Sequence, residues 1–334
     1  MKRLNRQSGI SLVEILVALV ISLFLLAGIV QVYTGNRATF SFTSALAEIQ
    51  ENGRFALDAM SQDLRLIGDW GCVTFDDADT SNFNDNLPGM GGYNANLHDY
   101  LGEEAIEGTE GGGLNGSDSL TLRGGKPGQA NVKADVGTST FPGAGTARLF
   151  TSKIRSIGGG DIILVARCGA NDLLIPAEAD ILEVTSVDNT NPLQTQINLG
   201  SNKSQQYEND AVVIELQTVT YSIAAGASGE PALWRTEFGN AQELVEGVEE
   251  MQVLYGIDSD SDQFPNQYVT ANNVPDFDDV VSLRVALLVR SIDDFVTEDS
   301  QTYTFNGVTT TPADRRIRQV FTTTIALRNR IGSS

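Results

Sequence analysis

One acidic side chain, Glu14, stands alone in the apolar stretch near the start of this 334-residue chain. It is the only charged residue between Ile10 and Asn36. An ionisable group inside a membrane-spanning helix costs about 2.5–3.5 kcal/mol on insertion scales, so by default it marks a functional site. A cation beside the carboxylate would offset that cost. Cleavage after Gly9 would provide one, because the new α-amino group of Ile10 would lie about one helical turn from Glu14. We therefore predict that Glu14 pairs with this amine, in its own chain or in a neighbour, and sets the register between packed helices.

Three alternating aspartates, Asp258, Asp260 and Asp262, form a second candidate site. They match the first, third and fifth positions of a calcium-binding loop, which supplies oxygen ligands from those positions. The loop is not an EF-hand, because Gln263 replaces the glycine and Val269 replaces the bidentate glutamate. Two interpretations stay open, a calcium site and a solvated acidic turn. We expect no other cofactor.

The two cysteines, Cys72 and Cys168, are far apart in the chain, and His98 is the only histidine. These numbers exclude a zinc site built from several imidazoles or thiolates. Nothing in the sequence orients His98 toward a nucleophile, and the G-x-S-x-G motif does not occur, so we expect no enzyme. Outside the cytoplasm the cysteine pair favours a disulfide, worth up to about 4–5 kcal/mol in the chain-entropy model. Two buried free thiols are the alternative.

The chain is strongly acidic, with 22 Lys+Arg against 43 Asp+Glu and a net charge of -21. This charge repels nucleic-acid backbones, so we expect no nucleic-acid partner. A basic cluster near the C-terminus is the exception. It is interpreted either as a solvent-facing strand edge that discourages edge pairing or as a docking patch for an acidic neighbour. Its members are Arg315, Arg316, Arg318, Arg328 and Arg330.

The N-terminus has the composition of a membrane anchor. Residues 1–9 are basic and residues 10–36 are apolar. At 1.5 Å per residue, about 20 helical residues cross the hydrocarbon layer of about 30 Å. The basic leader is expected in the cytoplasm and the acidic body on the other side. A secretory signal would carry its small residue after the apolar run, whereas Gly9 precedes it. An ordinary single-pass anchor is the alternative.

The order of these features resembles the class III signal of type IV pilins and type II secretion pseudopilins. A basic leader is followed by Gly9, an apolar first mature residue, Ile10, and a glutamate at the fifth mature position, Glu14. Ile10 departs from the pattern, since Phe or Met is commoner there. The resemblance implies that prepilin peptidase cuts after Gly9 and methylates Ile10, and that the mature subunit polymerises from the inner membrane.

The apolar stretch continues as an amphipathic pattern as far as Ile67, with steps of three, four and seven residues. We predict one helix over residues 10–67, with a membrane-spanning half (10–36) and an amphipathic half (37–68) that ends near Gly68. Glycines at 28, 35 and 53 each weaken it by about 1 kcal/mol relative to alanine. The predicted packing face consists of Phe42, Leu46, Ile49, Ala56, Met60, Leu64 and Ile67.

Residues 69–334 are predicted to form a β-rich extracytoplasmic domain, with a loop-rich insertion at about 76–116. The fold class is therefore α+β and pilin-like: a long N-terminal helix packed on a large antiparallel β-sheet domain. A GGGLNG run at 111–116 lacks the preceding strand and following helix that nucleotide binding needs. The predicted strands are 119–123, 161–167, 181–187, 195–199, 211–223, 232–236, 251–257, 280–291, 301–305 and 317–328.

Three further features resemble the PilW family of minor pilins: residues 59–72, residues 243–262, and the pair of segments VSLRVALLVRS and TTTIALRNR. The resemblance implies a minor pilin in the initiation or tip complex of a type IV pilus, with roles in adhesion and twitching motility. Implied partners are prepilin peptidase, other minor pilins, the major pilin and a tip-associated adhesin. The implied location is the inner membrane, with a periplasmic C-terminus, and then the pilus at the cell surface.

Two alternatives remain. One is a GspJ-like minor pseudopilin of a type II secretion system. The other is a membrane-anchored extracytoplasmic enzyme or calcium-binding domain.

Overall fold

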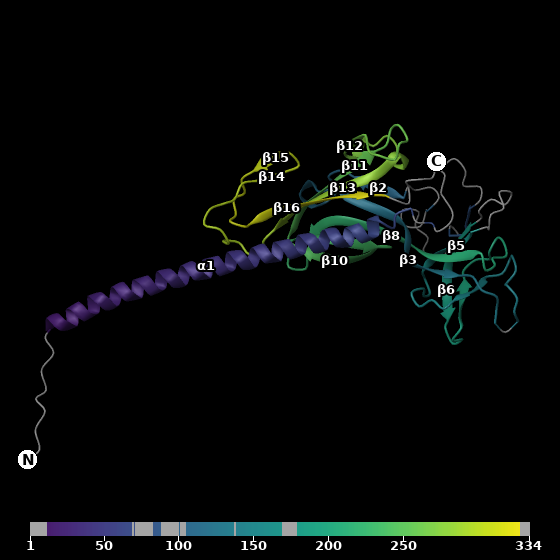
Figure 1. Ribbon diagram of the computed structural model, residues 1–334, viewed down its shortest axis with the longest axis horizontal. Helices are drawn as coiled ribbons and strands as arrows, with labels where there is room; N and C mark the ends of the chain where they lie inside the picture. Colours follow the sequence, from purple (N-terminus) through teal and green to yellow (C-terminus); the bar gives the residue numbers. More distant parts are fainter. Residues whose placement is uncertain are drawn as a thin grey trace, which may run out of the picture.

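The computed structural model describes residues 12–68, 70, 83–87, 100, 105–136, 138–168 and 179–327. A single long helix, α1 (Leu12–Leu64), leads into a β-rich body. Its first half extends away from the body, and its second half lies along it (Figure 1). This is the predicted α+β architecture of one long apolar helix followed by a large antiparallel sheet domain.

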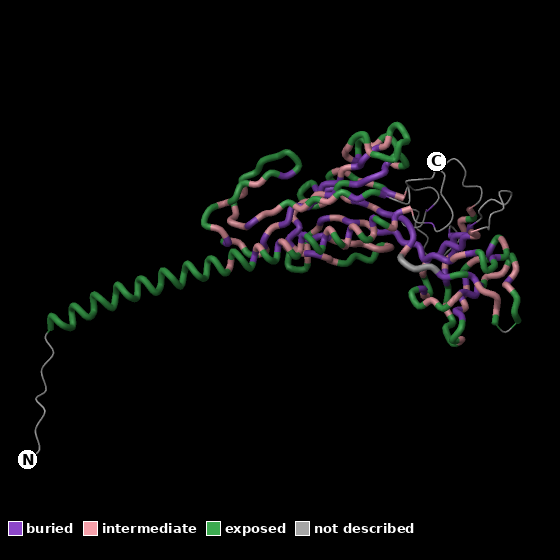
Figure 2. The backbone as a smooth tube through the Cα atoms, in the orientation of Figure 1, coloured by how far each residue is buried: buried purple, intermediate pink, exposed green. Residues whose placement is uncertain are grey.

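The two halves of α1 differ in burial because only the second half has an amphipathic pattern. Residues 12–44 contain no buried residue, as the continuous exposed stretch in Figure 2 shows. Phe42, predicted on the packing face, is 41% exposed. Leu46, also predicted there, is only partly buried. The buried positions repeat at intervals of three and four residues and confirm the predicted face at Ile49, Ala56, Met60 and Leu64. They are Ala45, Ile49, Gly53, Ala56, Met60 and Leu64.

Helix α1 ends three residues before the predicted Ile67. The amide of Leu66 donates to the carbonyl of Asp63 (3.0 Å), which tightens the last turn. Ile67 then leaves the helix and forms an antiparallel β-bridge with Gly124. Gly68 follows with a positive φ of 67°, a conformation that glycine adopts without strain.

Two sheets form the body. The first is a four-stranded antiparallel sheet of β12 (Gln267–Val269), β11 (Val248–Ile257), β13 (Val280–Arg290) and β16 (Arg318–Ala326), in that order. The second has ten strands. Its main path is β10 (Asn240–Glu246), β9 (Pro231–Glu237), β8 (Ala211–Ala225), β5 (Ile162–Arg167), β6 (Ala179–Asp188), β7 (Gln194–Leu199) and β4 (Arg148–Ser152).

Shorter elements complete the body. Strand β3 (Ser119–Asn131) pairs with β8 and with β2 (Ile106–Thr109), and β1 (Phe83–Asp85) pairs with β6. Strands β14 (Tyr303–Phe305) and β15 (Val308–Thr310) form a separate hairpin. The 3-10 turns are Leu114–Gly116, Ala271–Asn273 and Phe277–Asp279.

Helix α1 packs where the two sheets meet, and the three together enclose the larger core. The helix contacts β16 and β13 of the four-stranded sheet and β10 of the ten-stranded sheet. Ile49, Met60 and Leu64 pack there with residues of β13 such as Leu283 and Val285, all fully buried. The second half of α1 is therefore part of the body rather than an appendage on it.

A second core lies beyond the C-terminal end of α1, in a small closed barrel. Strands β8, β5, β6, β7 and β4 pair in sequence, and β3 pairs with β8 on the other side. The ring closes because Val132, directly after β3, bridges Thr151 in β4, and the amide of Lys133 donates to the carbonyl of Phe150 (2.8 Å). We call this unit, residues 130–213, the distal barrel. Its strands β5 and β6 lie at the end of the molecule opposite the start of α1 (Figure 1).

All ten predicted strands occur, with shifted ends, but six strands lie outside the prediction: β1, β2, β4, β10, β12 and β15. Strands β1 and β2 fall within the segment 76–116, where we predicted loop. The alternating apolar residues at 281, 283, 285, 287 and 289 predict one buried face of β13, and those at 283, 285, 287 and 289 lie in the larger core. Val281 does not join it, because a register shift opposite Ile257 places Val280 in the core instead.

Candidate assembly surface

The first half of α1 exposes a continuous apolar surface. Every large apolar side chain from Leu12 to Tyr33 is more than half exposed. The helix is long and apolar enough to cross a membrane. An exposed apolar surface of this length requires either lipid or other apolar helices around it.

Glu14 lies in the first described turn of α1, on this surface. Its predicted cation is the amine of Ile10, and the predicted cleavage follows Gly9. Both of these residues lie outside the described residues, so the cleavage site and the ion pair stay predictions.

Polar contacts attach the end of α1 to the ten-stranded sheet. The carboxylate of Asp63 accepts a hydrogen bond from the Arg235 guanidinium (2.8 Å) and another from the Tyr221 hydroxyl (2.6 Å). Burial, with the nearby Asp63 carboxylate, raises the pKa of Tyr221, so the hydroxyl remains a donor. Farther back, the Asn52 amide donates to the Glu246 carbonyl (3.2 Å). Packing and polar contacts together orient the exposed half of α1 relative to the body.

Gly53 lets α1 approach β16 closely. A Cβ atom at this position would lie 2.5 Å from the ring of Phe321, closer than carbon atoms can approach. From the sequence, Gly53 is only a weak point in the helix. The spacing in the sequence could have indicated this role, because Gly53 lies four residues after Ile49 and three before Ala56, on the same buried face of the helix.

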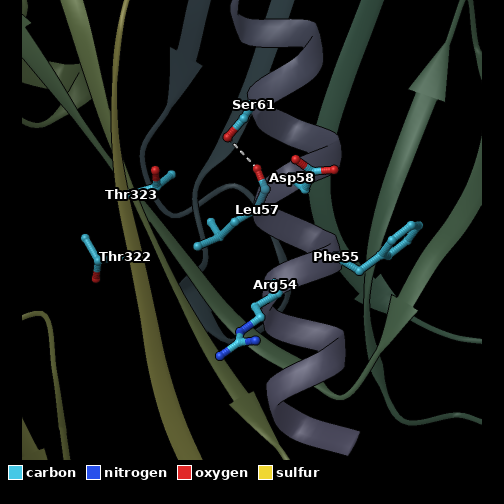
Figure 3. Close-up of a pocket in the computed structure, with 7 residues that line it drawn as sticks. All are labelled: Arg54, Phe55, Leu57, Asp58, Ser61, Thr322 and Thr323. Atoms are coloured by element: carbon cyan, nitrogen blue, oxygen red, sulfur yellow. Dashed lines mark hydrogen bonds between the residues drawn. The ribbon is translucent and has the colours of Figure 1, made fainter.

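An open groove runs between α1 and β16 (Figure 3). Leu57 points from the helix toward β16, and Thr322 points away from the helix. The groove lies where the second half of α1 packs on the body, and no pattern in the sequence predicts it. Its lining residues are Arg54, Phe55, Leu57, Asp58, Ser61, Thr322 and Thr323.

The predicted acidic loop follows β11. Asp258, Asp260 and Asp262 each place a carboxylate oxygen within 4.8 Å of the others, close enough for one cation to contact all three. The Asp258 carboxylate accepts backbone hydrogen bonds from Gln263 (2.7 Å) and from the other two aspartates (3.2 and 3.3 Å). Partial desolvation opposes these bonds, but together they lower the pKa of Asp258. The geometry fits both a calcium site and a turn closed by its own amides.

Two members of the basic cluster near the C-terminus, Arg316 and Arg318, belong to an internal network of ion pairs, so both sequence-based interpretations are wrong for them. The Arg318 side chain is only 3% exposed and pairs with Glu249 (2.6 Å) and Asp314 (2.7 Å). Arg316 pairs with Glu230 (2.9 Å). Carboxylates within the body neutralise the positive charges of these arginines, so little charge remains for binding a partner. Arg328 and Arg330 lie outside the described residues.

Two comparisons with known families bear on this arrangement. The prokaryotic N-terminal methylation motif matches residues 4–30. The family of Type IV Pilus-assembly protein W, PilW, matches residues 220–329. Over these residues the chain is similar to type IV pilus minor pilins of the PilW family. A search of curated proteins found no match.

The two matches cover different parts of the chain. The methylation motif covers the exposed start of α1. The PilW match begins within β8 and runs through β16, so it includes the strands that hold the second half of α1. The distal barrel lies outside both. The two family matches point to a structural component of a pilus rather than to an enzyme.

The predicted disulfide is partly outside the described residues. Cys168 directly follows β5 and is half-buried, and no free cysteine occurs in the described part of the chain. Cys72 is not described. Trp70, two residues before it, is buried with Ala166, two residues before Cys168. This packing brings the two regions together, and the bond itself stays a prediction.

Proposed function

We propose that this chain is a minor pilin of the complex that starts type IV pilus assembly and remains at the pilus tip. The exposed apolar half of α1, held rigidly by a half that is built into the body, carries the proposal. An isolated subunit leaves this surface to lipid, whereas a filament covers it with neighbouring helices. A subunit that waits in the inner membrane and then joins a filament would place this surface first in lipid and then against other helices.

The distal barrel supports the tip position. It extends the body beyond the C-terminal end of α1, the end opposite the exposed half (Figure 1). In a bundle of parallel α1 helices, a unit at this end would occupy space needed by the subunit above. A subunit at the tip has none above it. Contacts with a tip-associated adhesin, and thereby roles in adhesion and twitching motility, follow from that position.

The remaining partners follow from the N-terminal motif. Prepilin peptidase would cut after Gly9 and methylate Ile10, and other minor pilins and the major pilin would pack along α1. The body would be periplasmic until assembly. The PilW match over residues 220–329 favours a pilus over the pseudopilus of a type II secretion system.

Substitution of Glu14 tests the proposal in cells. We expect full-length Glu14→Ala to be cut and methylated at Ile10, seen by mass spectrometry of the mature N-terminus, but to be depleted from sheared pili. Fewer pili should form, because the register between helices is lost. Ser22→Ala, on the same exposed surface, is the matched control; its hydroxyl bonds only the carbonyl of Ala18 (2.7 Å).

A bulky residue at the cleavage site should block processing, so Gly9→Val should retain the leader. Wild-type incorporation of Glu14→Ala would contradict the role of the carboxylate. Normal pilus number after deletion of the whole chain would contradict the function in pilus initiation.

A further inference from the structure

Strand β16 is an edge strand without the usual protection. Within the described part of the chain it is last in its sheet, and no strand pairs with its outer edge. Residues 319–327 contain no charged residue and no proline. The pairing of β13 with β16 runs from Arg318 to Ala326 without a register shift. A long, regular, uncharged edge is a template for another strand.

The other long edges of the body are protected by devices that β16 lacks. Strand β10 carries Glu243 and Glu246 and has a register shift at Glu243. Strand β4 is closed onto the chain after β3. Strands β12 and β2 are short, at 3 and 4 residues. The contrast indicates that β16 is kept open for a partner.

The position of β16 shows where such a partner would come from. The open edge borders the groove beside α1 (Figure 3). In the proposed function, neighbouring subunits pack along this helix. Alternate residues of the strand, including Val320 and Thr324, are exposed. A subunit that packs along α1 therefore meets this edge.

We infer that the outer edge of β16 receives an extended strand from a neighbouring, less acidic pilin subunit. This inference rests on the proposed function. Main-chain groups of an edge are satisfied in register by a strand and not by a helix. The uncharged stretch from Gln319 to Leu327 is roughly 26 Å long, at about 3.3 Å per residue step. A second copy of this chain is disfavoured, because two chains that each carry a net charge of -21 repel each other.

Charge substitution on the edge tests the inference in the full-length chain. Val320→Lys with Thr324→Lys places two cations on β16, in the way that natural edges are blocked. The matched control is Val308→Lys with Thr310→Lys on the exposed hairpin strand β15. We expect the β16 variant to be processed and to show wild-type thermal unfolding, yet to lose association with its neighbouring pilin. The control should keep that association.

A photo-crosslinking residue at Thr322, compared with one at Thr309, identifies the occupant. We expect position 322 alone to join a strand peptide of another prepilin-type subunit, identified by mass spectrometry. A cross-link to an apolar helix, to a second copy of this chain or to nothing would overturn the inference. The experiment is carried out in cells that need this chain to form pili. Absence of the cross-link in such cells refutes strand addition but does not contradict the proposed function.

Discussion

At the scale of single residues, Gly53 shows how packing reverses a local preference. Alanine is favoured over glycine within a helix by about 1 kcal/mol. At position 53 a methyl group would instead lie 2.5 Å from the Phe321 ring. At Gly35, on the exposed half, a methyl group would have no other atom within 4 Å beyond the adjacent helix backbone. The same substitution should therefore have opposite effects at the two sites.

Gly53→Ala should lower the free energy of unfolding by about 1–3 kcal/mol, since α1 and β16 must separate to admit the methyl group. Gly35→Ala should be neutral or stabilising by up to about 1 kcal/mol. Urea denaturation of the full-length chain in detergent measures both. Equal stability of the two variants would show that the helix does not approach β16 so closely.

At the scale of elements, the distal barrel contains a buried cation. Lys203 is 1% exposed, and its ammonium donates to the carbonyl of Gly143 (3.0 Å) and to the hydroxyl of Thr146 (2.6 Å). Burial lowers the pKa of Lys203 to about 8, with the nearby Asp180 opposing the change and Arg148 adding to it. Lys203 thus attaches the segment before β4 to the barrel, and the burial of its positive charge opposes this stabilisation.

This lysine should make the barrel more stable as the pH rises. Above pH 8 the folded state loses the proton that the unfolded state keeps until about pH 10.5, so unfolding takes up a proton. Between pH 8 and 9.5 the gain should reach about 1–2 kcal/mol in urea denaturation. Lys203→Met should abolish this part of the gain. Lys153→Met, at an exposed position of the same barrel, should retain it; identical pH profiles for all three proteins would refute the assignment.

At the scale of the whole molecule, the start of helix α1 and the distal barrel lie at opposite ends of the subunit and are connected through the body (Figure 1). Strand β8 contributes residues to both cores, and β3 leads from the larger core to Val132 in the barrel. Trp70 joins the end of the helix to the barrel strands. A disulfide between Cys72 and Cys168 would add a covalent link at the same place.

Peptide mapping of the exported chain under non-reducing conditions should therefore recover Cys72 joined to Cys168. Replacing both by serine should cost about 2–4 kcal/mol, because the unfolded chain regains the freedom of a long loop. Two thiols that react with an alkylating agent in the native protein would end this prediction.

The elements that the sequence predicts well are those with a local periodic signal. The apolar run and the repeat from Ile49 to Leu64 are sufficient for α1, because helix faces recur every three or four residues. The alternation of Leu283 and Val285 with Arg284 is sufficient for β13. Glu14 stands out for the same reason, as a single charge in an uncharged run.

Tertiary structure alone decided the rest, because it depends on contacts between residues distant in the chain. Closure of the distal barrel depends on Val132 meeting Thr151, and the ion pairs of Arg318 depend on Glu249. Local patterns carry no information about such meetings. The open edge of β16 is likewise a property of strand order. The uncharged sequence is visible in the chain, but only the assembled sheet shows that no other described strand pairs with that edge.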